Sequence, residues 1–257
     1  MDDTEKVLNA SKGIPEIFKT VQKSFMKSFH EALANFTEQR ARIVETIRNE
    51  FAERFPKEIQ PIISALADRG WFISGEAGFS SLLELKDFLD QEHAEIIDLK
   101  MADWISESIP SIERSLAEDF PERLPFLSAA IRAHSDKEYE LSVPIFLIQA
   151  EGICLDLLKV KLFSSSSGVP ITKKAINKLE INPFTKSMLF PLLEGSGITA
   201  SEHERHKYPT CLNRHEILHG IDVKYANRMN SLKALSLIWF LCTILSDVIS
   251  KSHKEYK

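Results

Sequence analysis

Apolar residues recur at steps of three and four along nearly the whole chain, which is the period of an amphipathic helix. In the N-terminal part this pattern predicts one long helix or two stacked helices over residues 14–55, because glycine and proline are absent from Glu16 to Phe55. The long stretch offers a packing surface, for the rest of the protein or for a second copy, and no reactive chemistry. Its apolar positions begin with Ile14, Phe18, Val21, Phe25, Phe29, Leu33 and Phe36.

The rest of the chain also divides into helical segments, separated by glycine, proline and serine. The predicted helices cover residues 59–67, a segment opening at Ser80 or Ser81, residues 94–109, a segment opening at Ser111, a segment from Pro121 through Ile131, residues 141–163, a segment from Pro209 that carries residues 213–220, and a last helix capped by Asn230 or Ser231. No alternating β pattern extends beyond a few residues. We therefore expect an all-α helical bundle, with an N-terminal helical region over residues 1–75 and a helical domain over residues 76–257.

Composition narrows the class of protein. The formal net charge is −5, whereas proteins that bind nucleic acid over their whole surface are usually basic, so any RNA contact must use a local patch. Three cysteines without a CxxC pair predict reduced, unreactive thiols and a cytoplasmic location. The acidic N-terminus has no apolar core of a signal peptide. The apolar stretch 234–249 is shorter than the roughly 20 residues that span a bilayer, so we expect a buried helix and no membrane partner.

Residues 213–220, Asn-Arg-His-Glu-Ile-Leu-His-Gly, gather the side chains that reaction chemistry needs. His215, Glu216 and His219 form His-Glu-x-x-His, the helix motif of zinc metalloproteases. A catalytic zinc needs a third protein ligand. No histidine follows Gly220 at the required spacing, the only later glutamate is Glu255, and no sheet is predicted. A second cluster, His203, His206 and Cys211, is more typical of a solvated polar loop. We therefore expect neither a metal nor another cofactor.

The same residues support a metal-free alternative. Arg214 and His219 form Arg-x4-His, followed by Lys-Tyr-Ala at 224–226 and Asn-Ser-Leu-Lys-Ala-Leu at 230–235, and preceded by a strongly apolar segment at 139–153. These segments resemble the HEPN superfamily, in particular bacterial HEPN and abortive-infection-like proteins. The resemblance implies an all-α homodimer in which two Arg-x4-His motifs meet in a composite cleft. It also implies metal-independent RNA cleavage by a toxin, a phage-defence effector or an RNA processor.

The residue types fit that chemistry, because RNA carries its own nucleophile, the 2′-OH. We assign His219 as general acid or base and Arg214 as the stabiliser of charge on the phosphate oxygens. Asn213 and His215 are candidates for orientation or substrate contact, and Glu151 for orienting a cation, unless it is a buried structural residue. Lys224 and Arg228 extend a basic patch that also occurs at ordinary solvated helix ends. The patch contains Arg205, His206, Lys207, Arg214, His215, His219, Lys224, Arg228 and Lys233.

Three functions therefore remain open at the level of sequence. The favoured one is a metal-independent endoribonuclease acting as a dimer, with a possible antitoxin or trigger protein as a further partner. The second is a non-catalytic HEPN module that binds RNA, a nucleotide or a partner protein. The third is a zinc hydrolase built on His-Glu-x-x-His.

Overall fold

The computed structural model describes residues 27, 40, 45, 54–76, 79–90, 94–200, 202–208 and 211–254. The long helix predicted over residues 14–55 lies almost entirely outside them. By its contacts the chain separates into two compact units, Met1–Glu53 and Arg54–Lys257, and the second unit is the one described here. A helix over residues 54–68, assigned from sequence to the N-terminal region, belongs to this second unit.

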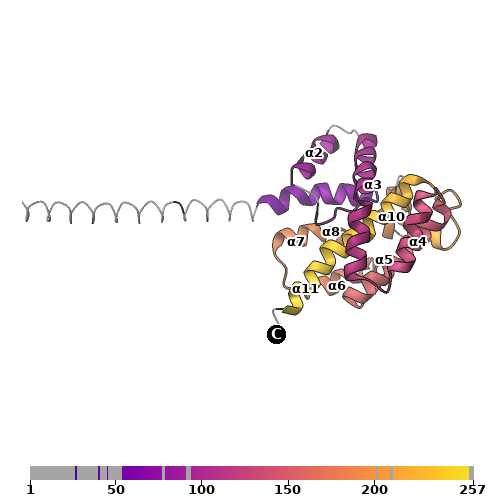
Figure 1. Ribbon diagram of the computed structural model, residues 1–257. Helices are drawn as coiled ribbons and strands as arrows, with labels where there is room; N and C mark the ends of the chain where they lie inside the picture. The colour runs from indigo at the N-terminus through magenta and orange to yellow at the C-terminus, as the bar shows by residue number, and fades with distance from the viewer. Residues whose placement is uncertain are drawn as a thin grey trace, which may run out of the picture. The chain divides into compact units, whose positions relative to one another are not determined.

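The described unit is an all-α bundle, which confirms the predicted class (Figure 1). After the helix over 54–68, its helices are α2 (Phe79–Asp90), α3 (Ala94–Asp119), α4 (Leu124–Ser135), α5 (Tyr139–Leu158), α6 (Ile171–Ile176), α7 (Pro183–Met188), α8 (Phe190–Glu194), α9 (Arg214–Leu218), α10 (Arg228–Phe240) and α11 (Ser246–Lys254). Short 3-10 turns cover Gly197–Thr199 (η1) and Glu202–Lys207 (η2), and a π-helical turn, Leu241–Leu245 (η3), joins α10 to α11. The strands β1 (Ser165–Ser166) and β2 (Val169–Pro170) form one antiparallel hairpin.

Helices α5 and α10 form the centre of the core. Helix α10 packs against α5 and α3, and α4 lies along α5 (Figure 1). Every residue of α10 from Ser231 to Phe240 is buried. The indole of Trp239 packs on that of Trp104 from α3, with the ring centroids 5.0 Å apart. Burial on all sides explains why this segment is apolar around its whole circumference.

Several helix boundaries differ from the sequence prediction. Helix α4 begins at Leu124 rather than Pro121, and α5 covers Tyr139–Leu158 rather than 141–163. Helix α3 runs without a break through Pro110, where the pattern predicted two helices. Proline inside a helix costs about 3 kcal/mol, but Ile105, Ile112 and Leu116 on both sides of it are buried and hold the helix together. Helix α10 begins earlier than expected, because the Asn227 side chain, rather than that of Asn230 or Ser231, caps it.

Two helices are long and apolar enough to cross a membrane by length and composition alone. They are Tyr139–Leu158 and the continuous helix Arg228–Ser252, which is longer than the predicted stretch 234–249. In the second helix 78% of the apolar window is buried inside the protein. Core helices pass the same test, and the buried helix predicted over 234–249 is confirmed.

Candidate functional site

The motif lies on a single helical turn, α9, that Asn213 starts. The Asn213 Oδ1 accepts a hydrogen bond from the backbone N–H of Glu216 at 3.1 Å, which is the standard N-cap contact. Its Nδ2 donates to the carbonyl of Ala200 at 2.8 Å. Asn213 is 2% exposed and both of its polar side-chain atoms are engaged, an arrangement that favours an orienting role for it over substrate contact. The prediction of one helix from Pro209 through the motif is wrong, because residues 211–213 are not helical and α9 begins only at Arg214.

Arg214 differs from every comparable arginine in the described part of the chain. The other half-buried arginines, Arg69, Arg123 and Arg205, each pair with a carboxylate at 3.1 Å or less. Arg214 has no carboxylate partner among the described residues, and its buried Nε has no hydrogen-bond partner there. Its guanidinium lies 5.2 Å from the centre of the Phe163 ring. A partly desolvated cation without a counter-ion is costly, so this arrangement favours an anion from outside the described chain.

His215 and His219 lie together at the surface. Both side chains are exposed, and their ring centroids are 4.4 Å apart at an interplanar angle of 56°. The four-residue spacing explains this contact, because positions i and i+4 share one helix face. His219 is also the C-cap residue of α9. A single copy of the protein therefore carries two imidazoles on one helix face, with the Arg214 guanidinium on the same turn.

The zinc interpretation needs Glu216 as a catalytic base, but this carboxylate is engaged in an ion pair. The Glu216 Oε2 accepts from Nε of Arg205 at 3.1 Å, and both side chains are about three-quarters buried. Arg205 also donates to the carbonyl of Tyr208. No group of three or more histidine, cysteine or carboxylate side chains suited to a metal ion occurs among the described residues. No third metal donor therefore lies beside His215 and His219 among the residues that the structure describes.

Glu151 contacts the backbone of Phe163, the residue whose ring lies beneath Arg214. Its Oε2 accepts from the backbone N–H of Phe163 at 3.2 Å. Among the described residues no hydrogen bond or ion pair joins Glu151 to Arg214, His215 or His219. It therefore fixes the backbone of the residue whose ring lies beneath Arg214. Phe163 is the one site residue that sequence reasoning missed, since a single phenylalanine 51 positions before Arg214 carries no local signal.

The predicted basic patch is smaller than the sequence suggests. Lys233 is 2% exposed and lies over the Trp71 ring, and burial lowers its pKa. Arg205 is neutralised by Glu216. Arg228 leans on α3, where it donates to Ser106 Oγ at 2.9 Å. Lys224 is exposed, and no contact within the described chain joins Lys224 or Arg228 to Arg214 or the two histidines.

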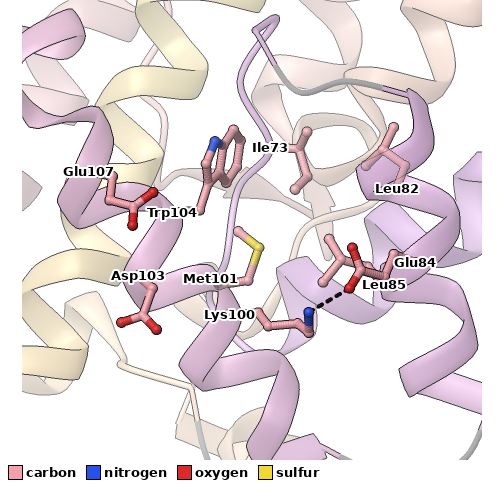
Figure 2. Close-up of a pocket in the computed structure, with 9 residues that line it drawn as sticks. All are labelled: Ile73, Leu82, Glu84, Leu85, Lys100, Met101, Asp103, Trp104 and Glu107. Carbon is pink, nitrogen blue, oxygen red and sulfur yellow. Dashed lines mark hydrogen bonds and ion pairs between the residues drawn. The ribbon is translucent and has the colours of Figure 1, made fainter.

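A separate cavity of about 280 Å³ lies between α2, α3 and Ile73 (Figure 2). Its walls are apolar, with Met101 and Trp104 on the α3 side, and it shares no lining residue with α9. Figure 2 shows carboxylates lining it, where Glu84 binds Lys100, the one lysine among the described lining residues, at 2.5 Å. A lining with this excess of carboxylates repels a polyanion, so the cavity does not suit RNA.

The three cysteines do not supply a nucleophile. All are buried free thiols, as the sequence predicted. Burial raises the pKa of Cys211 to about 12, and burial together with the neighbouring Glu151 raises that of Cys154 to about 12. Because the thiolate is the reactive form, these side chains are inert at neutral pH.

Comparison with known proteins provides no further assignment: no family model, no curated protein and no solved structure matches the chain. The resemblance to the HEPN superfamily therefore stays a prediction, and the candidate site rests on its own geometry.

Proposed function

We propose that the protein is a metal-independent endoribonuclease of HEPN type, acting in the cytoplasm as a toxin or phage-defence effector. The observation that carries the proposal is Arg214, the one half-buried arginine of the described chain without a carboxylate partner, on the same helical turn as two exposed imidazoles. A phosphodiester supplies the missing anion, and histidine supplies proton transfer near neutral pH.

The reaction follows from these groups. The Arg214 guanidinium binds the non-bridging oxygens of the scissile phosphate and stabilises the charge that builds up on them. One imidazole removes the proton of the 2′-OH, whose oxygen attacks phosphorus. The other imidazole protonates the departing 5′-oxygen. The products are a 2′,3′-cyclic phosphate and a 5′-hydroxyl, and no water is consumed in this step.

Two sources of the second imidazole are compatible with this scheme. His215 lies 4.4 Å from His219, centroid to centroid, in the same chain. In a homodimer with a composite cleft, the second copy would bring its own His219. The His215→Ala variant separates these cases, because it loses activity as severely as His219→Ala only if His215 takes part in proton transfer.

The test is cleavage of a mixed RNA pool in EDTA by wild type and by Arg214→Ala, His219→Ala and Arg132→Ala. Arg132 is an exposed arginine on α4 and serves as the matched control. Loss of Arg214 should slow cleavage about 10²–10³-fold and loss of His219 about 10²–10⁴-fold. Arg132→Ala should leave the rate unchanged. Full activity in both motif variants, with the helical circular dichroism intact, refutes the proposal.

One observation favours the second candidate, a non-catalytic module that binds RNA, a nucleotide or a partner protein. Within the described chain neither exposed imidazole has a side-chain hydrogen bond that would orient it, whereas catalytic histidines usually have one. For such a module, wild type would bind RNA without any turnover, and Arg214→Ala would weaken binding.

A further inference from the structure

Another cavity, of about 430 Å³, lies where the end of α5, the helix α6 and the helix α11 come together (Figure 1). Its volume is within the range of small-ligand sites. It shares no lining residue with α9 or with the cavity between α2 and α3. This α6 cavity is therefore separate from the candidate nuclease site.

Apolar side chains from all three helices line the α6 cavity. Leu158 and Ile249 belong to the hydrophobic core, and most of the others pack against that core while staying partly exposed. The apolar lining consists of Leu157, Leu158, Val160, Ile171, Ala175, Leu179 and Ile249. Such a surface favours an alkyl chain as its ligand, because binding removes apolar area from water on both sides.

The charged side chains of the lining are all lysines. Lys159, Lys174 and Lys178 are exposed, and no carboxylate lines the cavity among the described residues. Lys159 donates to a backbone carbonyl of α5 at 2.8 Å. The side chains of Lys174 and Lys178 have neither an ion pair nor a hydrogen bond within the described chain, whereas their neighbour Lys173, outside the lining, pairs with a glutamate of α8 at 2.6 Å. Two such ammonium groups beside an apolar surface attract an anion.

We propose that the α6 cavity binds a free, single-chain anionic amphiphile, namely a fatty-acid anion of medium chain length. The alkyl chain lies against the apolar lining, and the carboxylate binds Lys174 and Lys178. The same lysines repel a cationic amphiphile, and a fully polar anion leaves the apolar lining uncovered. The concave shape suits one molecule rather than a bilayer, because a protein that lies on a membrane inserts a projecting apolar face between the lipids.

The experiment is calorimetric titration of the full chain with decanoate, decylammonium and hexanoate, each below its micelle concentration. Decanoate should bind about tenfold or more tightly than decylammonium, which has the same chain and the opposite charge. Hexanoate should bind at least about tenfold more weakly than decanoate, since each CH₂ group removed from water contributes roughly fourfold to affinity.

The double variant Lys174→Gln, Lys178→Gln removes the two charges and keeps side chains of similar polarity. It should weaken decanoate binding about tenfold and leave little preference for decanoate over decylammonium. The matched control is Lys86→Gln, Lys186→Gln, which changes the net charge equally at exposed lysines of α2 and α7 outside the lining. The control should bind decanoate as wild type does, and circular dichroism checks that both variants fold.

Three results overturn the fatty-acid site: no binding of decanoate, equal affinity for decanoate and decylammonium, or decanoate binding that the double variant does not weaken. Flotation with phosphatidylglycerol vesicles tests a membrane source of the same chemistry. A chain that binds vesicles through Lys174 and Lys178 but does not bind free decanoate has a membrane-docking surface instead, which also overturns the proposal. Because no residue of α9 lines the cavity, these results are independent of RNA cleavage.

Discussion

Replacing Asn213 with alanine tests the structural basis of the motif turn. The substitution removes two short contacts at once, besides a longer one of 3.5 Å from Nδ2 to the Gly197 carbonyl. The backbone N–H of Glu216 loses its cap, and the carbonyl of Ala200 loses the amide that donates to it at 2.8 Å. The first contact starts a helix, and the second satisfies a carbonyl in a buried environment, since Ala200 is 6% exposed.

The expected loss of stability is the sum of these two effects. Removal of an asparagine N-cap costs about 1 kcal/mol. Leaving a buried carbonyl without a donor costs a further ~1–3 kcal/mol. We therefore expect Asn213→Ala to lower the free energy of unfolding by about 2–4 kcal/mol. RNA cleavage should fall as well, because the turn that holds Arg214 and His219 loses its anchor.

Urea unfolding followed by circular dichroism measures this loss, and Asn227→Ala is the matched control. Asn227 caps α10 through the same contact, with Oδ1 accepting from Asn230 at 2.9 Å, but it is exposed. Its Nδ2 also donates to the Tyr225 carbonyl at 3.2 Å, but that carbonyl accepts from Asn230 Nδ2 as well, so replacement should cost only the ~1 kcal/mol of a cap. Equal losses in the two variants would refute the role of the buried amide. Unchanged stability together with lost cleavage would mean that Asn213 contacts RNA after all.

The remaining predictions concern the core and the turn behind the motif. Burial, and to a smaller extent the charge of Arg228, lowers the pKa of His134, whose Nδ1 bonds the Ser231 hydroxyl. The neutral imidazole should therefore stabilise the fold fully above pH ~6.5, and this stabilisation should be lost as the pH falls below that value. His134→Gln should abolish this part of the pH dependence of urea unfolding. A Cβ on Gly197 would lie 2.8 Å from the Cys211 sulfur, so Gly197→Ala should destabilise the fold by ~1–3 kcal/mol in the same assay. The three buried thiols should react with a thiol reagent only after unfolding; rapid labelling of the native protein would contradict their burial.

The sequence predicts the buried helices well, because their period depends on local spacing. The apolar segment 139–158 forms a core helix. Gly70, with a positive φ of 87°, ends the helix over residues 54–68, as a C-cap glycine does. The predicted helix break at Pro110 is wrong, because burial against residues that are distant in the sequence outweighs the local free-energy cost of a proline inside a helix. Asn227 and Asn230 are equally good caps on paper, and only the backbone geometry at Asn227 decides between them.

The candidate site is predicted only in part. The positions of Arg214, His215 and His219 on one turn follow from their spacing. Phe163, the Arg205–Glu216 pair and the burial of Lys233 depend on tertiary contacts that no local pattern encodes. Of these contacts, the Arg205–Glu216 pair matters most for the choice between the two mechanisms, because it occupies the carboxylate that a metalloprotease would use as its base.

The contact between Glu151 and the backbone of Phe163 has a consequence for the entropy of binding. Glu151 belongs to the central helix α5, so the backbone of the residue whose ring lies beneath Arg214 is anchored to the core of the described unit. A free arginine side chain loses up to ~2 kcal/mol of rotamer entropy when it is ordered. Since the Phe163 ring already restricts this guanidinium, much of that cost is met during folding, and an arriving anion gains affinity from a cation that is already in place.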